Sequence, residues 1–88
     1  MKKYKNKSNL QEIPGVGAII EKDLQDIGIS CMNDLRGKKP ENLYNKLCKL
    51  KKTNIDKCEL YVFRCAVYYV ENNKHDLNLL KWWNWKDK

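Results

Sequence analysis

A chain of 88 residues is long enough for one small domain, in which each buried side chain matters because the core is modest. A hydrophobic content of 42% with 10% aromatic residues excludes an intrinsically disordered chain, and no apolar run approaches the roughly 18 residues that a membrane-spanning helix needs. The formal net charge of +7 favours polyanionic partners, although a lysine-rich surface can serve solubility alone.

The first eight residues are predicted to form a flexible basic arm, ahead of a single domain that spans residues 9–88. The lysines of this arm are Lys2, Lys3, Lys5 and Lys7. A charged start is also typical of secretion signals, but the segment that follows, SNLQEIPG, is polar rather than apolar. We therefore expect a soluble, cytoplasmic protein that makes no membrane contact.

The domain is predicted to begin with a short helix, NLQEI, in which Asn9 and Glu12 have the spacing of a capping box. Pro14 ends this helix because proline lacks the N–H group and restricts the residue before it. The glycines that follow predict a tight turn. A second helix is expected from Ala18 and ends at Gly28, which acts as a left-handed cap. Its apolar stripe consists of Ile19, Ile20, Leu24 and Ile27.

A second unit of the same kind is predicted from residue 30 onward. Ser30 is the expected N-cap of a short helix, CMNDL, that stops at Gly37. After a charged turn, Pro40 occupies the position where the next helix, ENLYNKLCKL, begins. The apolar stripe of that helix consists of Leu43, Leu47 and Leu50.

The longest predicted helix, roughly residues 55–72, is apolar almost all round and therefore belongs in the middle of a bundle. Asn73 and Lys74 interrupt it, and Asp76 is the expected N-cap of a last helix, LNLLKWWNW. No segment alternates with period two for long enough to indicate a strand. The sequence thus predicts an all-α fold, a compact bundle of about five helices with a Trp-rich C-terminal helix.

Residues 13–17, Ile-Pro-Gly-Val-Gly, match the h-P-G-h-G pattern of the helix-hairpin-helix motif, in which h is an aliphatic residue. The glycines of such a turn allow close approach to a duplex backbone, and free N–H groups of the next helix point at a phosphate oxygen. Contacts of this kind read no base edges, so binding is independent of sequence. The alternative interpretation is a compact helix connection used for packing or for a protein partner.

Candidate DNA-binding groups lie in this turn and on nearby lysines. The turn residues are Gly15, Val16, Gly17 and Ala18, and the lysines are Lys22, Lys38, Lys39, Lys49, Lys51 and Lys52. Glu21, Asp23 and Asp26 lie on the helix that would meet the phosphates, and they would repel a phosphate backbone unless they face away. The lysine-rich second turn is therefore at least as strong a candidate for the DNA contact.

The chain resembles the small bacterial helix-hairpin-helix proteins of the pathogenicity-locus, or mitomycin-resistance, family. The matching stretches are IPGVG at 13–17, DLRGKKPENLYNKLC at 34–48, YVFRCAVYY at 61–69 and HDLNLLKWWNWKD at 75–87. The resemblance implies a tandem helix-hairpin-helix fold, SAM-domain-like and similar to modules of DNA repair and recombination. Residues 34–44 would correspond to a degenerate second hairpin. No well-defined activity is implied.

The cysteines are interpreted as small apolar core residues. They are Cys31, Cys48, Cys58 and Cys65. A zinc site would combine the last three of these with His75, but a CxxC knuckle is lacking, and Cys58 and Cys65 would lie ~10–11 Å apart along one helix. A redox or other thiol role is the remaining alternative. We therefore expect no metal and no cofactor.

An acid–base role for His75 beside Asp76 is disfavoured because adjacent residues at a helix start do not face one another. No nucleophile motif, phosphate-transfer loop or distinctive carboxylate pair accompanies them, so we expect a protein that is not an enzyme. The stretch KWWNWK allows Trp82 to point inward together with Trp85 or with Leu79, and in either case it leaves Trp83 near the surface. The tryptophans either cover the core, form a protein interface or stack on unpaired bases.

The expected function is non-catalytic, sequence-independent binding of double-stranded DNA through the hairpin amides and the nearby lysines. The alternative is a protein–protein interaction module that uses the hairpin face or the Trp-rich C-terminus. The sequence does not indicate an oligomeric state.

Overall fold

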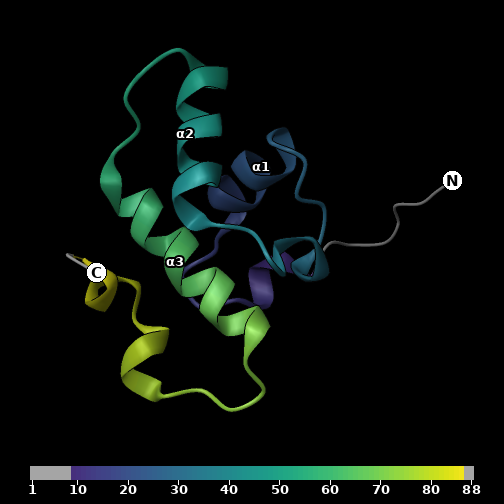
Figure 1. Ribbon diagram of the computed structural model, residues 1–88, viewed down its shortest axis with the longest axis vertical. Helices are drawn as coiled ribbons and strands as arrows, with labels where there is room; N and C mark the ends of the chain where they lie inside the picture. The colour runs from purple at the N-terminus through teal and green to yellow at the C-terminus, as the bar shows by residue number, and fades with distance from the viewer. Residues whose placement is uncertain (1–8, 87–88) are drawn as a thin grey trace, which may run out of the picture.

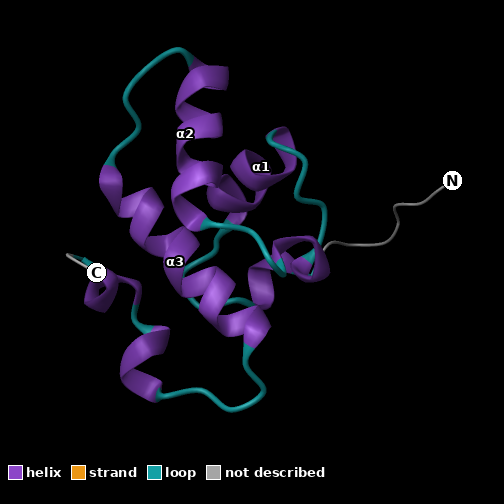
Figure 2. Cartoon of the chain, viewed as in Figure 1, coloured by secondary structure: helices purple, strands orange, loops and turns teal. Residues whose placement is uncertain are grey.

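The computed structural model describes residues 9–86, and its secondary structure is helical throughout (Figures 1 and 2). The α-helices are α1 (Ala18–Asp26), α2 (Pro40–Lys51) and α3 (Lys57–Glu71). Short 3₁₀ helices complete the fold: η2 (Leu10–Glu12), η3 (Met32–Leu35), η4 (Leu77–Leu80) and η5 (Trp82–Trp85). The all-α prediction is confirmed, whereas the predicted basic arm, residues 1–8, lies outside the described residues.

Helix α3 forms the centre of the fold and contacts α2, η3, η4 and η5 (Figure 1). Phe63, Cys65 and Ala66 in its middle are fully buried, as expected for a helix that is apolar almost all round. Its start is fixed by Asp56, whose side chain accepts a hydrogen bond from the backbone N–H of Cys58 at 2.9 Å. The helix is therefore slightly shorter than the predicted span of residues 55–72.

Helices α1 and α2 begin and end where their local sequence predicts. Pro40 opens α2 at a position where its missing N–H costs nothing. Gly28 has a φ of +99° and ends α1 as a left-handed cap, with the N–H of Ile29 donating to Leu24 O at 2.9 Å. Leu24 and Leu47, one from each helix, are fully buried in the common core.

The two predicted caps of the short helices are wrong. Asn9 makes no cap on η2, and its Oδ1 instead accepts a hydrogen bond from the N–H of Met32 at 2.8 Å, which joins η2 to η3. The residue before η3 is Cys31 rather than Ser30, and the N–H of Ser30 donates to Asp34 Oδ2 at 2.9 Å. The Asn9 side chain thus bonds to a different element, and at Ser30 the printed bond is made by the backbone N–H.

The Trp-rich segment forms two 3₁₀ turns, η4 and η5, rather than the single helix that was predicted. Lys81, between them, has extended backbone angles. The Asp76 cap is confirmed, since its side chain accepts a hydrogen bond from Asn78 N at 2.9 Å. Trp82 and Trp85 are partly buried and Trp83 is 51% exposed, which confirms the predicted orientation of the three rings.

The C-terminal segment covers the turn at residues 14–17. A Cβ atom placed on Gly15 would lie 3.2 Å from Trp82 Cδ1, and Gly15 also has a φ of +90°. The Cys65 thiol lies between the two segments, 4.0 Å from Pro14 O and 3.5 Å from Leu79 O. Gly17, by contrast, has an extended backbone and no atom within 4 Å of its Cβ position. Only the first of the two glycines is therefore required by backbone conformation and packing.

We expect Gly15→Ala to destabilise the protein and Gly17→Ala to have a smaller effect. The first change adds left-handed strain and a tight contact with Trp82, for a loss of about 1–3 kcal/mol in the free energy of unfolding. The second replaces a tolerated N-cap residue by a poorer one and costs less than about 1 kcal/mol. Thermal unfolding of both variants measures the difference, and equal losses would contradict this account of the turn.

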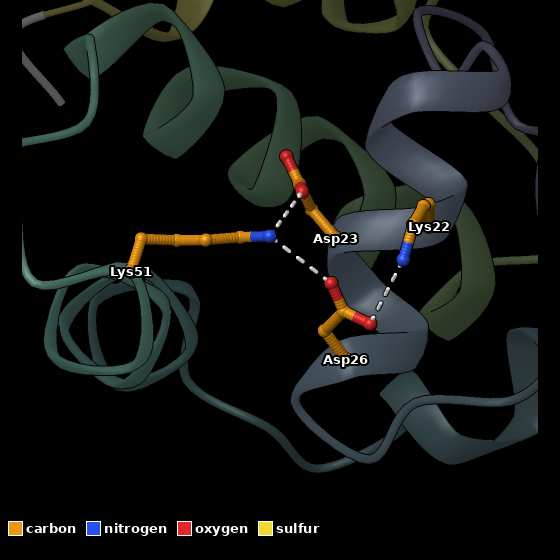
Figure 3. Close-up of polar contacts among 4 residues, drawn as sticks. All are labelled: Lys22, Asp23, Asp26 and Lys51. Carbon is orange, nitrogen blue, oxygen red and sulfur yellow. Dashed lines mark hydrogen bonds and ion pairs between the residues drawn. The ribbon is translucent and has the colours of Figure 1, made fainter.

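A cluster of charges joins the ends of α1 and α2 (Figure 3). The Nζ atom of Lys51, the last residue of α2, lies 3.1 Å from Asp26 Oδ2 and 3.7 Å from Asp23 Oδ1. Lys22 Nζ lies 3.4 Å from the other oxygen of Asp26. The hydrogen bond from Lys51 is the main reason that the pKa of Asp26 is lowered, and the same bond raises the pKa of Lys51.

Glu59 of α3 lies next to Asp23 of this cluster and is partly buried. Its Oε2 atom is inaccessible to solvent and has no hydrogen-bond partner among the described residues. Burial, followed by the neighbouring Asp23 carboxyl, raises the pKa of Glu59 to about 8. The folded protein therefore favours a protonated Glu59 at neutral pH.

A raised carboxyl pKa means that the folded state binds more protons than the unfolded state, so stability should fall as pH rises from about 4.5 toward 8. Glu59→Gln removes this titration while it keeps the size of the side chain. We expect the melting temperature of the wild type to fall relative to that of Glu59→Gln between pH 5 and 9, by roughly several degrees. A constant difference between the two proteins across this range would contradict a titrating, buried Glu59.

Candidate nucleic-acid interface

The start of α1 presents backbone N–H groups without a capping side chain. The first helical hydrogen bond runs from Glu21 N to Gly17 O at 2.9 Å, so the N–H groups of Ala18, Ile19 and Ile20 precede the bonded part of the helix. No side chain of the described residues caps them. Such amides, at the positive end of the helix dipole, suit a phosphate oxygen.

The other predicted turn residues have different roles. The N–H of Val16 donates to Ile13 O at 3.0 Å, and its side chain is buried, so this residue holds the turn together. Gly15 lies against the Trp82 side chain, where a Cβ atom would be tightly placed. The amide groups open to a ligand are therefore those that follow Gly17, rather than the whole of the sequence PGVG.

An acidic and an apolar side chain lie close to these amides. Glu21, in the first turn of α1, accepts a hydrogen bond from Gln11 Nε2 at 2.7 Å, and its charge stabilises this end of the helix. Ile19 is 77% exposed, which makes it one of the most exposed large apolar side chains of the described chain. The sequence pattern instead predicted Ile19 as part of the buried stripe, and that prediction is wrong.

The structure divides the predicted lysines into two groups. Lys22 and Lys51 are engaged with the acids of α1, although the Lys22 side chain remains 73% exposed. The others are exposed and make no ion pair with any residue between 9 and 86. They are Lys38, Lys39, Lys49 and Lys52.

The outer side of α2 carries two exposed lysines without an ion pair to residues 9–86, Lys46 and Lys49, and the other three flank the ends of the helix. Asn42, Asn45, Lys46 and Lys49 line a shallow hollow of about 340 Å³. Their spacing places them along one side of the helix, away from the buried Leu43 and Leu47. Lys46 was missed as a site residue, although its position three residues before Lys49 was a usable signal. We call the following set the lysine face: Lys38, Lys39, Asn42, Asn45, Lys46, Lys49 and Lys52.

The lysine face and the α1 amides belong to different parts of the surface. Lys51 holds the last turn of α1 against the end of α2. The N-terminal amides of α1 lie the length of that helix away from this junction, about 12 Å at the usual rise per residue. A single duplex would have to contact two separate patches to use both.

The cysteines and His75 have no common site. Cys65 is buried, and burial raises the pKa of its thiol to about 11. Cys31 and Cys48 are partly buried, but Cys58 is exposed, so the prediction of a core cysteine is wrong for this residue. His75 stacks on Tyr69, and its Nε2 atom lies 2.8 Å from Tyr69 O. Within residues 9–86, no group of three or more His, Cys, Asp and Glu side chains is placed to hold a metal ion.

None of the helices in the described part of the chain has the length and apolar content that a bilayer span requires.

Comparison with known proteins finds neither a curated protein nor a solved structure that matches this chain. The family model Cdd1, described as pathogenicity locus, matches residues 3–88. The match includes both turns, the lysine face and the Trp-rich segment, and it confirms the resemblance seen in the sequence. The chain belongs to the Cdd1 pathogenicity locus family.

Proposed function

We propose that this protein binds double-stranded DNA without sequence preference and without catalysis. The observation that carries the proposal is the lysine face, whose five lysines are exposed and free of ion pairs with residues 9–86. Lysines on one side of a helix bind phosphates as point charges and read no base edges. The amides after Gly17 provide a second phosphate contact of the same sequence-independent kind.

Pairing of the acids within the protein supports this assignment. Asp23 and Asp26 share the positive charge of Lys51, and Asp26 also pairs with Lys22, which reduces the repulsion that α1 would exert on a phosphate backbone. Glu41, in the first turn of α2, lies 3.2 Å from Arg64 Nη2. These three acids are thus paired with cations that lie outside the lysine face, whereas Glu21, in the first turn of α1, is hydrogen-bonded to the neutral Gln11.

The proposal includes a tandem helix-hairpin-helix interpretation of the fold, of the SAM-domain-like kind. Two units follow one another, each with a 3₁₀ turn, a glycine at positive φ and an α-helix. In the second unit Gly37 has a φ of +78°, and its N–H donates to Glu71 Oε2 at 2.7 Å. We propose the bacterial cytoplasm as the place where this module meets DNA.

A second candidate function is a protein–protein interaction through the hairpin face or the Trp-rich end. It is favoured by the exposed apolar side chains, since exposed aromatic groups in particular are enriched at interfaces. These side chains are Ile19, Leu50, Leu77 and Trp83. They lie on four different elements or turns, which fits a single continuous interface less well than the lysine face fits DNA.

The double variant Lys46→Ala, Lys49→Ala should weaken binding to duplexes of unrelated sequence by similar factors. Each lost phosphate contact lowers the slope of log affinity against log salt by about 0.9, so the double variant should lose about 1.8. The matched control is Lys57→Ala, Lys74→Ala, which removes the same charge from exposed positions outside the lysine face. Fluorescence anisotropy over a salt series measures both slopes. An equal effect of the two double variants would show that only net charge matters.

Gly17→Asp should stabilise the protein or leave its stability unchanged, yet weaken DNA binding. Aspartate is a preferred N-cap residue and would occupy the free amides of α1 with its own carboxylate. Gly17→Ala, which leaves those amides free, is the control for the change in size. We expect a loss of affinity on the order of tenfold, since one charge-assisted contact contributes roughly 1.5–3 kcal/mol. Unchanged affinity in Gly17→Asp would remove the α1 amides from the proposed interface.

A further inference from the structure

Trp83 is the exposed tryptophan of the Trp-rich segment, and its neighbours in that segment are held by contacts with the rest of the protein. Trp82 lies against Gly15. Asn84 Nδ2 donates to Asn78 O at 2.8 Å, and Trp85 Nε1 donates to Leu79 O at 2.8 Å. The backbone of this turn is held as well, because Arg64 Nη1 donates to Trp85 O at 2.8 Å.

The backbone that carries Trp83 is thereby held in position, while about half of the Trp83 side chain stays in contact with solvent. The centroid of its ring lies 5.6 Å from that of Trp82, with the two rings nearly perpendicular, so Trp82 contacts it in an edge arrangement rather than by stacking. A ring that is carried on a fixed backbone loses less conformational entropy on stacking than one on a mobile segment. Because the Trp83 ring is half exposed, it covers little of the hydrophobic core.

The surroundings of Trp83 are basic and polar. Residues 77–86 contain Lys81 and Lys86 and no acidic residue, and both lysines are exposed. Asp76, just before this segment, is engaged as the cap of η4. An aromatic ring among positive charges is typical of proteins that stack on bases while they neutralise the nucleic-acid backbone. A protein partner would instead favour a contiguous apolar patch.

The segment also has one neighbour near each of the two proposed DNA contacts. At one end Trp82 packs against Gly15, which is three residues before Ala18, the first of the α1 amides. At the other end Trp85 and Pro40 line the same pocket of about 380 Å³, next to Lys39 at the start of the lysine face. The acids of this pocket are engaged, since Glu41 pairs with Arg64 and Glu71 accepts from Gly37.

We propose that Trp83 stacks on an unpaired base, so that the preferred ligand is a duplex with unpaired bases next to it, such as an overhang or a gap. This inference rests on the proposed function, because the lysine face and the α1 amides hold the duplex part. Lys81 and Lys86 neutralise phosphates of the unpaired strand. The specificity is for unpaired structure and not for base sequence, since every base has a face that can stack.

The test compares three DNAs, a blunt duplex, the same duplex with a short overhang and the single strand, against the wild type, Trp83→Ala and Trp83→Phe. We expect the wild type to prefer the overhang. Trp83→Ala should lose about 5- to 150-fold in affinity for the overhang DNA, the range found when a stacking aromatic is replaced by alanine. Its affinity for the blunt duplex should not change. Trp83→Phe should keep most of the preference because a phenyl ring still stacks.

A second readout reports stacking independently of affinity. The fluorescent base 2-aminopurine, placed at the first unpaired position, should be quenched by saturating wild type and by Trp83→Phe, and much less by Trp83→Ala. Because Trp83 lies at the surface, circular dichroism should show the same fold for all three proteins.

The possible failures are distinguishable. Loss of blunt-duplex binding in the Lys46→Ala, Lys49→Ala variant, together with no preference of the wild type for the overhang, leaves the proposed function intact and overturns the stacking inference. Absence of any DNA binding by the wild type at low salt overturns both. If Trp83→Ala has the wild-type affinity for all three DNAs, the stacking inference is wrong and Trp83 is free to serve as a protein contact.

Discussion

The need to cover α3 on every side determines most of this structure. A helix with buried residues around most of its circumference cannot be satisfied by one neighbour, and α3 is covered by α2, η3 and the two turns of the C-terminal segment. The C-terminal turns are short, so they bury enough area only by using large aromatic rings. The Trp-rich sequence is therefore explained in the first place by the need to cover the core. One of its rings is exposed because the residues of a tight turn cannot all face the same side.

Local sequence patterns were sufficient to predict the α-helices and several of their ends. Apolar periodicity indicated all three, and Pro40, Gly28 and Asp76 marked boundaries because their effects depend on the backbone within a few residues. One of the predictions that were wrong, the cap by Asn9, fails because of a partner that lies far away in the sequence. Asn9 had the spacing of a cap, but the fold brings the N–H of Met32 to its side chain, and no local pattern contains that information.

The sequence was sufficient to name most residues of the candidate site, but it was not sufficient to predict how those residues are arranged in space. The lysines could be identified from the sequence, but the pairing of Lys51 with Asp23 and Asp26 depends on how α1 and α2 cross. Helical spacing alone would have added Lys46 to the site. The exposure of Ile19 was not predictable from periodicity, because a residue near a helix end can lie beyond the reach of the core that the rest of its stripe contacts.

The contact between Gly15 and Trp82 couples the two ends of the described chain. Contacts between residues so distant in sequence form late in folding, since the chain entropy lost in closing a large loop must first be compensated by other contacts. During synthesis on a ribosome, the first turn would remain without its cover until Trp82 had emerged. A nascent chain would thus acquire the finished geometry of this turn, and the surface built on it, only after the Trp-rich segment had been synthesised.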